Sequence, residues 1–147
     1  MEEEPNPNAP TPRQAARMRI PESRHRAARV GRHTPAHGEV NTVAMPWVNF
    51  GEDLAAILAG RATRDGNRFV VNGREYVLEG TGRLCPIAGE GFYQLGRGAY
   101  RALGWYNDLG LTGVAEAQLD QQLVREHERE TAREVWRALQ AWRQRQG

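Results

Sequence analysis

The stretch of sequence that decides the fold is Arg68-Phe69-Val70-Val71-Asn72-Gly73-Arg74-Glu75-Tyr76-Val77-Leu78-Glu79. Two runs rich in β-branched and aromatic residues flank an Asn-Gly pair. That pair is the strongest short-range signal for a β-hairpin, because a type I′ turn needs positive φ at both central positions. A two-residue loop pairs Val71 with Arg74 and Phe69 with Tyr76. One face of the predicted hairpin therefore carries Phe69, Val71, Tyr76 and Leu78, and the other carries Arg68, Val70, Glu75, Val77 and Glu79.

Turn and helix signals before and after the hairpin extend it into a small domain. Asn49, with Glu52 three residues later, is typical of a capping box and predicts a helix over residues 53–59 that buries Leu54, Ile57 and Leu58. Short strands are predicted over residues 61–64 and 83–87. Pro86 cannot donate a hydrogen bond to a neighbouring strand, so the second of these lies at an edge of the sheet.

The C-terminal half of the sequence favours helices. Residues 88–96 are interpreted as a Gly-rich loop, residues 97–107 as a helix, and residues 114–145 as one long helix whose Arg and Glu stripes form a solvated face. The predicted fold class is therefore α+β: a small antiparallel β-meander packed with three helices, including a long C-terminal helix, and preceded by an extended N-terminal arm.

The boundary of the arm follows from composition. All eleven aromatic residues lie at or beyond Trp47, whereas seven of the eight prolines lie at or before Pro46. A segment rich in proline and free of aromatic residues buries too little apolar area to offset its conformational entropy. We therefore expect residues 1–46 to be a flexible Arg/Pro-rich arm and residues 47–147 to form a single α+β domain.

Charge divides at the same boundary. Residues 1–46 hold seven Arg against five Glu, whereas residues 47–147 hold thirteen Arg against thirteen acids, and the chain contains no Lys. Such a segment is typical of an arm that lies along nucleic acid or an acidic protein surface, although a solvated linker has the same composition. The candidate nucleic-acid-binding residues are Arg13, Arg17, Arg19, Arg24, Arg26, Arg29, Arg32, Arg83, Arg97 and Arg101.

Several classes of site and location are disfavoured. The one cysteine, Cys85, excludes an internal disulfide and a Cys-based zinc cluster, and no metal or cofactor is expected. His25, His33 and His37 lie in the predicted arm, which gives no preorganised ligand geometry. The N-terminal sequence has no apolar signal-peptide core, and no apolar run reaches the roughly 18 residues of a membrane span. We therefore expect a cytoplasmic protein without a membrane contact.

Two further groups of residues have possible functions. Glu79 and Glu75, together with Arg74 and Tyr76, could supply the base, the cation and the acid of metal-independent RNA cleavage, although cross-strand ion pairs explain the same Arg and Glu residues equally simply. Trp136 and Trp142 stand near the end of the C-terminal helix, where they either pack against the domain or bind another protein.

One segment also resembles a known family. The pattern Asn72-Gly73-Arg74-x-Tyr76, then Pro86-x-x-Gly89-x-Gly91-Phe92, then Leu95, Arg97, Tyr100, Ala102 and Leu103, resembles a family of small bacterial proteins; the resemblance covers residues 60–104. It implies a small α+β shape similar to that of toxin domains that act on RNA. In those relatives a His often stands at the end of the second hairpin strand, where this chain has Glu79, which implies weakened or absent catalysis here.

Two functions follow as expectations. The first is a small nucleic-acid-associated binding protein, with RNA preferred to DNA as the partner, that could be a toxin-like ribonuclease acting through the residues near the hairpin. The alternative is a non-enzymatic assembly subunit, a phage or complex component, that docks through its arm and the Trp-bearing end of its last helix. Binding is preferred to catalysis because residues 47–147 contain one histidine and have no net charge.

Overall fold

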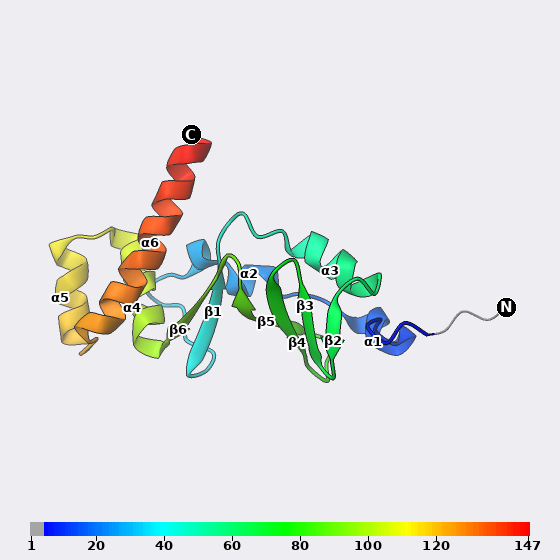
Figure 1. Ribbon diagram of the computed structural model, residues 1–147. Coiled ribbons are helices and arrows are strands. Elements are labelled where there is room, and N and C mark those ends of the chain that lie inside the picture. The colour runs from blue at the N-terminus through cyan, green and yellow to red at the C-terminus, as the bar shows by residue number, and fades with distance from the viewer. Residues whose placement is uncertain (1–4) are drawn as a thin grey trace. The chain divides into compact units, whose positions relative to one another are not determined.

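The computed structural model describes residues 5–147, and Figure 1 labels its helices and strands. The chain consists of two compact units. The first unit comprises residues up to Arg24 together with Trp47–Phe92, and the second comprises His25–Pro46 together with Tyr93–Gly147. Helices and strands occur in both units, so the fold class is α+β, as predicted. The predicted domain boundary at residues 46/47 differs from this division, since each unit combines residues from both sides of it.

The first unit is built on the predicted hairpin. Strands β3 (Arg68–Val71) and β4 (Arg74–Leu78) are antiparallel, with Val71 opposite Arg74 and Phe69 opposite Tyr76, which confirms the predicted register. Asn72 and Gly73 have φ values of 52° and 77°, as a type I′ turn requires. Strands β2 (Thr63–Asp65) and β5 (Leu84–Gly89) complete a sheet in the order β2-β3-β4-β5. β5 is therefore an edge strand, as Pro86 predicted.

Helix α3 (Phe50–Leu58) packs on this hairpin. The predicted cap is confirmed, since the Asn49 side chain accepts a hydrogen bond from the backbone N–H of Glu52 at 3.0 Å, and the helix begins directly after it at Phe50 and not at residue 53. Its buried side chains include Phe50, Asp53 and Ile57, whereas Leu58, which was predicted to be buried, is 41% exposed. The rings of Phe50, Tyr76 and Phe92 form an aromatic cluster with centroids 5.8 to 6.4 Å apart.

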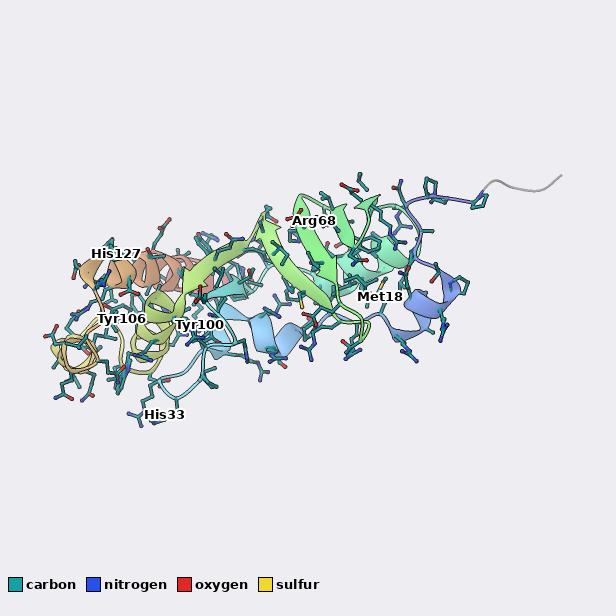
Figure 2. The ribbon with its side chains drawn as sticks, turned by 90° about the horizontal axis from the view of Figure 1, so that it is seen from below. Met18, His33, Arg68, Tyr100, Tyr106 and His127 are labelled. Atoms are coloured by element: carbon teal, nitrogen blue, oxygen red, sulfur yellow. The ribbon has the colours of Figure 1, made fainter. Side chains whose placement is uncertain are left out.

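Part of the predicted arm belongs to the first unit. Helix α1 (Pro12–Arg17) begins with a capping box on Thr11. Met18, which Figure 2 labels directly after this helix, is buried. Arg19 then pairs with the start of β5: its backbone N–H donates to Gly82 O at 3.0 Å, and its carbonyl accepts from Leu84 N at 2.7 Å. The segment from α1 to Arg19 is therefore held to the first unit by backbone hydrogen bonds and by the buried Met18 side chain. The arm was predicted from its lack of aromatic residues, and that criterion does not detect either kind of contact.

The second unit combines a two-stranded sheet with the remaining helices. Its sheet consists of β1 (Val40–Ala44) and β6 (Phe92–Gly96), and β6 occupies the segment that was interpreted as a loop. Helix α2 (Glu22–His25) belongs to the first unit up to Arg24 and to the second from His25, and the 3-10 turn η1 (Ala27–Arg29) of the second unit precedes β1 in the chain. Helices α4 (Arg97–Leu109), α5 (Gly113–Gln121) and α6 (Glu126–Gln146) follow β6, and α4 packs against both α5 and α6.

The rest of the predicted arm contributes to the core of the second unit. Ala27, Val30, Val43 and Met45 are each at most 3% exposed and belong to one apolar cluster with residues of α4, α5 and α6. An extended arm was expected for this segment because it lacks aromatic residues. Its small aliphatic side chains are instead buried against aromatic residues, such as Tyr100 and Tyr106, that α4 supplies.

The predicted single helix over residues 114–145 is wrong in one respect: it is interrupted at residues 122–125. Leu123 has a φ of 59°, and the N–H of Val124 donates to Leu119 O while that of Leu123 donates to Asp120 O, which is a Schellman termination of α5. Glycine normally marks this position, since a left-handed conformation costs other residues about 1–2 kcal/mol. The sequence therefore contained no local signal for the break.

The charged residues of α6 were predicted to form a solvated face, and part of that prediction is also wrong. Arg129 is 8% exposed and pairs with Glu116 of α5 at 3.0 Å and with Asp120 at 2.8 Å. Arg133 reaches the same Glu116 at 3.1 Å, and Tyr106 donates its hydroxyl hydrogen to Glu116 at 2.7 Å. These contacts fix α5 against α4 and α6, which explains why charged residues stand at buried positions.

Substitution of Gly104 by Ala is expected to destabilise the second unit. A Cβ on Gly104 would lie 2.3 Å from the carbonyl oxygen of Gly31, which is backbone and cannot move aside as a side chain can. Because the overlap is with backbone, its cost lies in the upper part of the range for overpacking, about 2–3 kcal/mol, which exceeds the gain of about 1 kcal/mol that Ala brings to a helix interior. Urea unfolding should show a net loss of about 1–2 kcal/mol.

The matched control is Gly113→Ala in α5, where a Cβ meets no atom within 4 Å. That variant should leave the free energy of unfolding unchanged or raise it by up to about 1 kcal/mol. Equal stability of the two variants would contradict the close approach of Gly31 to α4.

Candidate functional site

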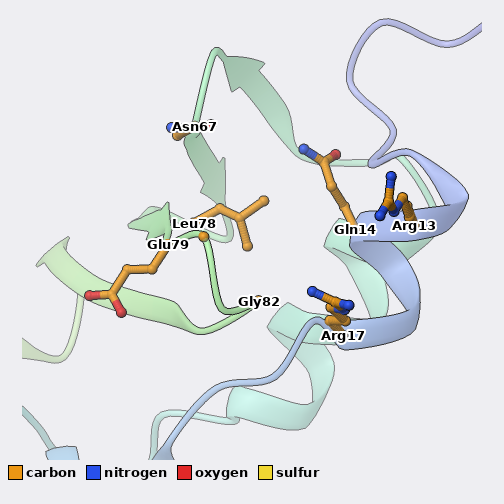
Figure 3. Close-up of a pocket in the computed structure, with 8 residues that line it drawn as sticks. Arg13, Gln14, Arg17, Asn67, Leu78, Glu79 and Gly82 are labelled. Carbon is orange, nitrogen blue, oxygen red and sulfur yellow. The ribbon is translucent and has the colours of Figure 1, made fainter.

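A surface cavity of about 270 Å³ in the first unit lies between α1 and the meander (Figure 3). Helix α1 contributes Arg13, Gln14 and Arg17 to its wall. The meander contributes Asn67 before β3, Leu78 at the end of β4, and the turn that follows, from Glu79 to Gly82. The cavity therefore brings together three residues that the sequence assigned to separate groups: two arm arginines and the candidate base Glu79.

The cationic groups of the two cavity arginines have no partner among residues 5–147. Both are exposed on α1, and neither side chain forms a hydrogen bond or an ion pair with any residue in the described range 5–147. Arg19, the next candidate, is also exposed, but its guanidinium donates to the carbonyl oxygen of Thr81 at 3.0 Å. Arg13 and Arg17 are thus available to a ligand. The Arg19 side chain is instead held by its hydrogen bond to Thr81, in the turn between β4 and β5.

The turn between β4 and β5 approaches α1 closely because of Gly82. Its φ is +92°, and a Cβ there would lie 2.5 Å from the carbonyl oxygen of Arg17. Only glycine fits a left-handed position with the neighbouring backbone so near. Gly82 therefore allows the turn after β4, which contains Glu79, to pack directly against the backbone of α1 at Arg17.

Glu79 lines this cavity, but its carboxylate is engaged elsewhere. Figure 3 shows the carboxylate pointing away from α1. It accepts a hydrogen bond from the Cys85 thiol at 3.0 Å and lies 3.9 Å from Arg83. Burial and this hydrogen bond raise the pKa of Cys85 to about 11, so the thiol is protonated at neutral pH. Glu79 thus acts as an acceptor for Cys85 and Arg83 in this structure.

The candidate catalytic residues Arg74 and Tyr76 lie in a separate, buried network centred on Asp53. Arg74 donates from Nε and Nη2 to the two carboxylate oxygens of Asp53 at 2.7 and 2.9 Å, and the Tyr76 hydroxyl donates to the same group. Asn72 adds a third donor at 2.8 Å. Asp53 and Tyr76 are fully buried and Arg74 is 7% exposed.

The charge states in this network follow from burial and hydrogen bonding together. Burial raises the pKa of Asp53, but the donors Arg74, Asn72 and Tyr76 outweigh it, and the pKa lies below its ordinary value. The hydrogen bond to Asp53 raises the pKa of Arg74, and burial beside the same carboxylate raises the pKa of Tyr76. The network is therefore a carboxylate–guanidinium pair capped by a neutral phenol.

The outer partners of Arg74 complete this network. Its Nη1 donates to Glu90 Oε2 at 2.5 Å, and the indole N–H of Trp47 donates to the other oxygen of Glu90 at 3.0 Å. All the donors of the network that point inward are satisfied by neighbours, which is the expectation for a buried ion pair that holds a fold together. Arg74 and Tyr76 are therefore structural in this chain, and the predicted role for them in RNA cleavage has no support from their positions.

Glu75 lies on the opposite face of the hairpin, as predicted. Its carboxylate pairs with Arg68 at 3.0 Å, so the simple interpretation as a cross-strand ion pair holds for these two residues. The structure thus places the four candidate catalytic residues in three environments: the buried network, the outer face of the sheet, and the wall of the cavity. It does not bring them together.

The other predicted nucleic-acid-binding arginines divide between the units. Arg24 and Arg83 belong to the first, and Arg26, Arg29, Arg32, Arg97 and Arg101 belong to the second. Three of those in the second unit have structural contacts. Arg26 donates to Met45 O at 2.9 Å, Arg97 donates to Gly38 O at 3.2 Å, and Arg32 lies 5.8 Å from the Trp105 ring centroid and 3.9 Å from Asp108.

The candidate partner-binding tryptophans lie on α6 of the second unit. Trp136 is half-buried and packs against the apolar core, beside the fully buried Leu139. Trp142, nearer the C-terminus, is also half-buried. Of the two interpretations that the sequence left open, packing therefore applies to Trp136.

Neither a metal site nor a membrane-spanning helix is found among the described residues. Among residues 5–147, no group of three or more His, Cys, Asp or Glu side chains is arranged to hold a metal ion. His33 and His127 are exposed, and Figure 2 shows His33 in the loop before β1 and His127 on α6 of the second unit. None of the helices in the described part of the chain combines the length and the apolar character of a membrane span.

Comparisons with known proteins found no matching family model, no similar curated protein and no similar solved structure. The resemblance of residues 60–104 to small bacterial proteins stays a prediction.

Proposed function

We propose that this protein binds nucleic acid, RNA in preference to DNA, through the cavity between α1 and the meander. The observation that carries the proposal is the pair of exposed cations, Arg13 and Arg17, on the wall of a concave surface, where neither pairs with a side chain of the described residues. Guanidinium groups form bidentate contacts with phosphate, and the energy of such contacts dominates nucleic-acid affinity. Arg19 adds positive charge at the same turn.

The proposal is one of binding and not of cleavage. A ribonuclease without a metal needs a base and an acid that reach the same phosphodiester. In this chain Tyr76 and Arg74 are enclosed with Asp53, and the Glu79 carboxylate accepts from Cys85. Incubation of the full chain with RNA should therefore give no cleavage. A cytoplasmic location, where a single thiol stays reduced, belongs to the same proposal.

The alternative, an assembly subunit that docks through the end of α6, has less support. One of its two anchor residues, Trp136, is packed against the core of its own unit. An acidic protein surface is a second partner class for the same arginines, and a wild-type chain that does not bind RNA in the experiment below would favour it.

Replacement of Arg13 and Arg17 by Ala together should weaken RNA binding and flatten its salt dependence. Each lost phosphate contact on a single strand should reduce the slope of log K against log salt by about 0.7. Fluorescence anisotropy with a labelled RNA of mixed sequence, measured between about 50 and about 200 mM salt, gives both quantities. Neither side chain is buried, so the fold should be unaffected.

The matched control is Arg61→Ala, which removes an exposed arginine of the same unit that does not line the cavity. It should leave the slope unchanged. If the double variant and the control bind RNA with the slope of the wild-type chain, the cavity is not the binding site. If the wild-type chain does not bind RNA at all, the proposed function is wrong.

A further inference from the structure

The cavity presents hydrogen-bond donors at its rim. Besides the two arginines, Gln14 takes part in the capping box of α1: its Oε1 accepts from the Thr11 N–H at 2.9 Å. The amide oxygen is thereby occupied, which leaves the Nε2 group to donate. Glu79, the one carboxylate among the lining residues, points away from α1 (Figure 3). A ligand of this cavity must therefore be rich in acceptors.

The floor of the cavity, by contrast, is apolar and small. Leu78 is 7% exposed, and the turn after it contributes Gly80 and Gly82, which have no side chains. Asn67 stands opposite α1, where its exposed side chain forms no hydrogen bond within the described residues, whereas its backbone carbonyl accepts from Leu78 N at 2.8 Å. The cavity thus combines a cationic rim, an apolar floor and one amide with both an acceptor and donors free.

Size limits what can enter. The volume of about 270 Å³ lies just below the roughly 300 Å³ at which clefts for drug-sized ligands begin. It suits one small planar group with its attached phosphate. In a duplex the bases are stacked and paired, so their faces cannot enter a concave site, whereas an unpaired base can be splayed out and read on its edge.

We propose that this cavity binds a single unpaired nucleotide. Its phosphate lies against Arg13 and Arg17, its base covers Leu78, and the base edge is within reach of Asn67 and Gln14. This inference rests on the proposed function and adds to it that the ligand is single-stranded. The Asn67 amide can pair with a base edge through one donor and one acceptor, and Gln14 can add a donor, which gives the site a means of preferring one base over another.

The test compares a labelled single-stranded RNA with the same RNA annealed to its complement, for the full chain and two variants. The wild-type chain should bind the single strand at least about tenfold more tightly than the duplex, since the loss of the base contacts costs more than one ordinary hydrogen bond. Asn67→Ala should weaken single-strand binding about fivefold without changing the salt slope, because it removes a contact to the base and not to phosphate.

Thr63→Ala is the matched control, since Thr63 is an exposed polar residue of the same sheet that does not line the cavity. It should bind both RNA forms as the wild-type chain does. Equal binding of the two forms, or Asn67→Ala with unchanged affinity for the single strand, overturns this inference. In either case the proposed function stands if the Arg13/Arg17 double variant still loses salt dependence. Absence of binding to both forms overturns the proposed function itself.

Discussion

Removal of residues 1–46 is expected to abolish folding of the remaining chain, not to release an independent domain. The deleted segment supplies buried residues to both units: Met18 to the first, and Ala27, Val30, Val43 and Met45 to the second. It also removes β1, the only partner of β6 within the described residues. The fragment 47–147 would therefore expose an unpaired strand and an open core.

The free energy that the deleted side chains contribute by burial is comparable to the total stability of a domain, and this is why loss of folding is expected. Burial of a Val or Met side chain contributes about 1.5–3 kcal/mol, so Val30, Val43 and Met45 together contribute about 5–9 kcal/mol. The total stability of a domain is about 5–15 kcal/mol. In addition, Gly104 lies directly against the backbone of Gly31, so the deletion leaves a vacant surface beside α4.

Circular dichroism and urea unfolding of fragment 47–147 measure the effect, and no cooperative transition is expected. The control is removal of residues 143–147, which are exposed in the structure and should leave the transition in place. A fragment 47–147 that unfolds cooperatively, with slowly exchanging amides in α4 and α6, would contradict the integral role of the leading segment. For the same reason, nucleic-acid binding is tested by point substitution and not by deletion of the arm.

Asp53→Asn is expected to destabilise the first unit by about 3–5 kcal/mol, which is the usual cost of removing one partner from a buried ion pair. The substitution preserves the shape of the side chain but leaves the Arg74 guanidinium without its buried counter-charge. Glu90 cannot compensate, because its carboxylate is 58% exposed and contacts only the outer Nη1 of Arg74. Urea unfolding followed through the amide signals of residues 68–78 reports on this unit.

The matched control is Glu75→Gln, which makes the same chemical change in the exposed pair with Arg68 on the other face of the hairpin. Exposed pairs contribute at most about 1 kcal/mol, so the two variants should differ severalfold. A loss as small for Asp53→Asn as for Glu75→Gln would show that the network does not hold the hairpin to α3.

The pH dependence of the same variant gives a second measurement. The folded-state pKa of Asp53 is lowered, so the stability it contributes is present above about pH 4, the ordinary value of the group, and is lost as pH falls through the lowered folded value. The difference in unfolding free energy between the wild-type chain and Asp53→Asn should therefore shrink as the solution is acidified. A difference that is constant with pH would indicate that Asp53 is neutral in the folded chain.

The Asp53 network was accessible from the sequence but was not predicted. The hairpin register that pairs Val71 with Arg74 places Arg74 on the same face as Phe69 and Tyr76, and a cation on a buried face requires a buried anion. In the helix before the hairpin, Asp53 stands three residues after Phe50 and four before Ile57, on the apolar face. The strand alternation that places Arg74 on the buried face and the helical spacing that places Asp53 on the apolar face together identify the ion pair.

The sequence by itself determined the elements whose causes are local. The Asn72-Gly73 turn, the register of β3 with β4, the cap at Asn49 and the edge position of β5 all depend on a few adjacent residues, because turn conformation and strand alternation are properties of short segments. The fold class follows from the same signals.

Only the tertiary structure decided which segments share a core and which residues share a site. The leading segment is built into both units because its scattered Val, Ala and Met side chains are covered by residues more than fifty positions away, and no local pattern records such a partner. The cavity exists for the same reason: Arg13 and Arg17 meet Asn67 and Glu79 where Gly82 lets two backbones approach. Which side chains are buried, and which come close together, depends on the packing of the whole chain. These features therefore cannot be predicted from one segment at a time.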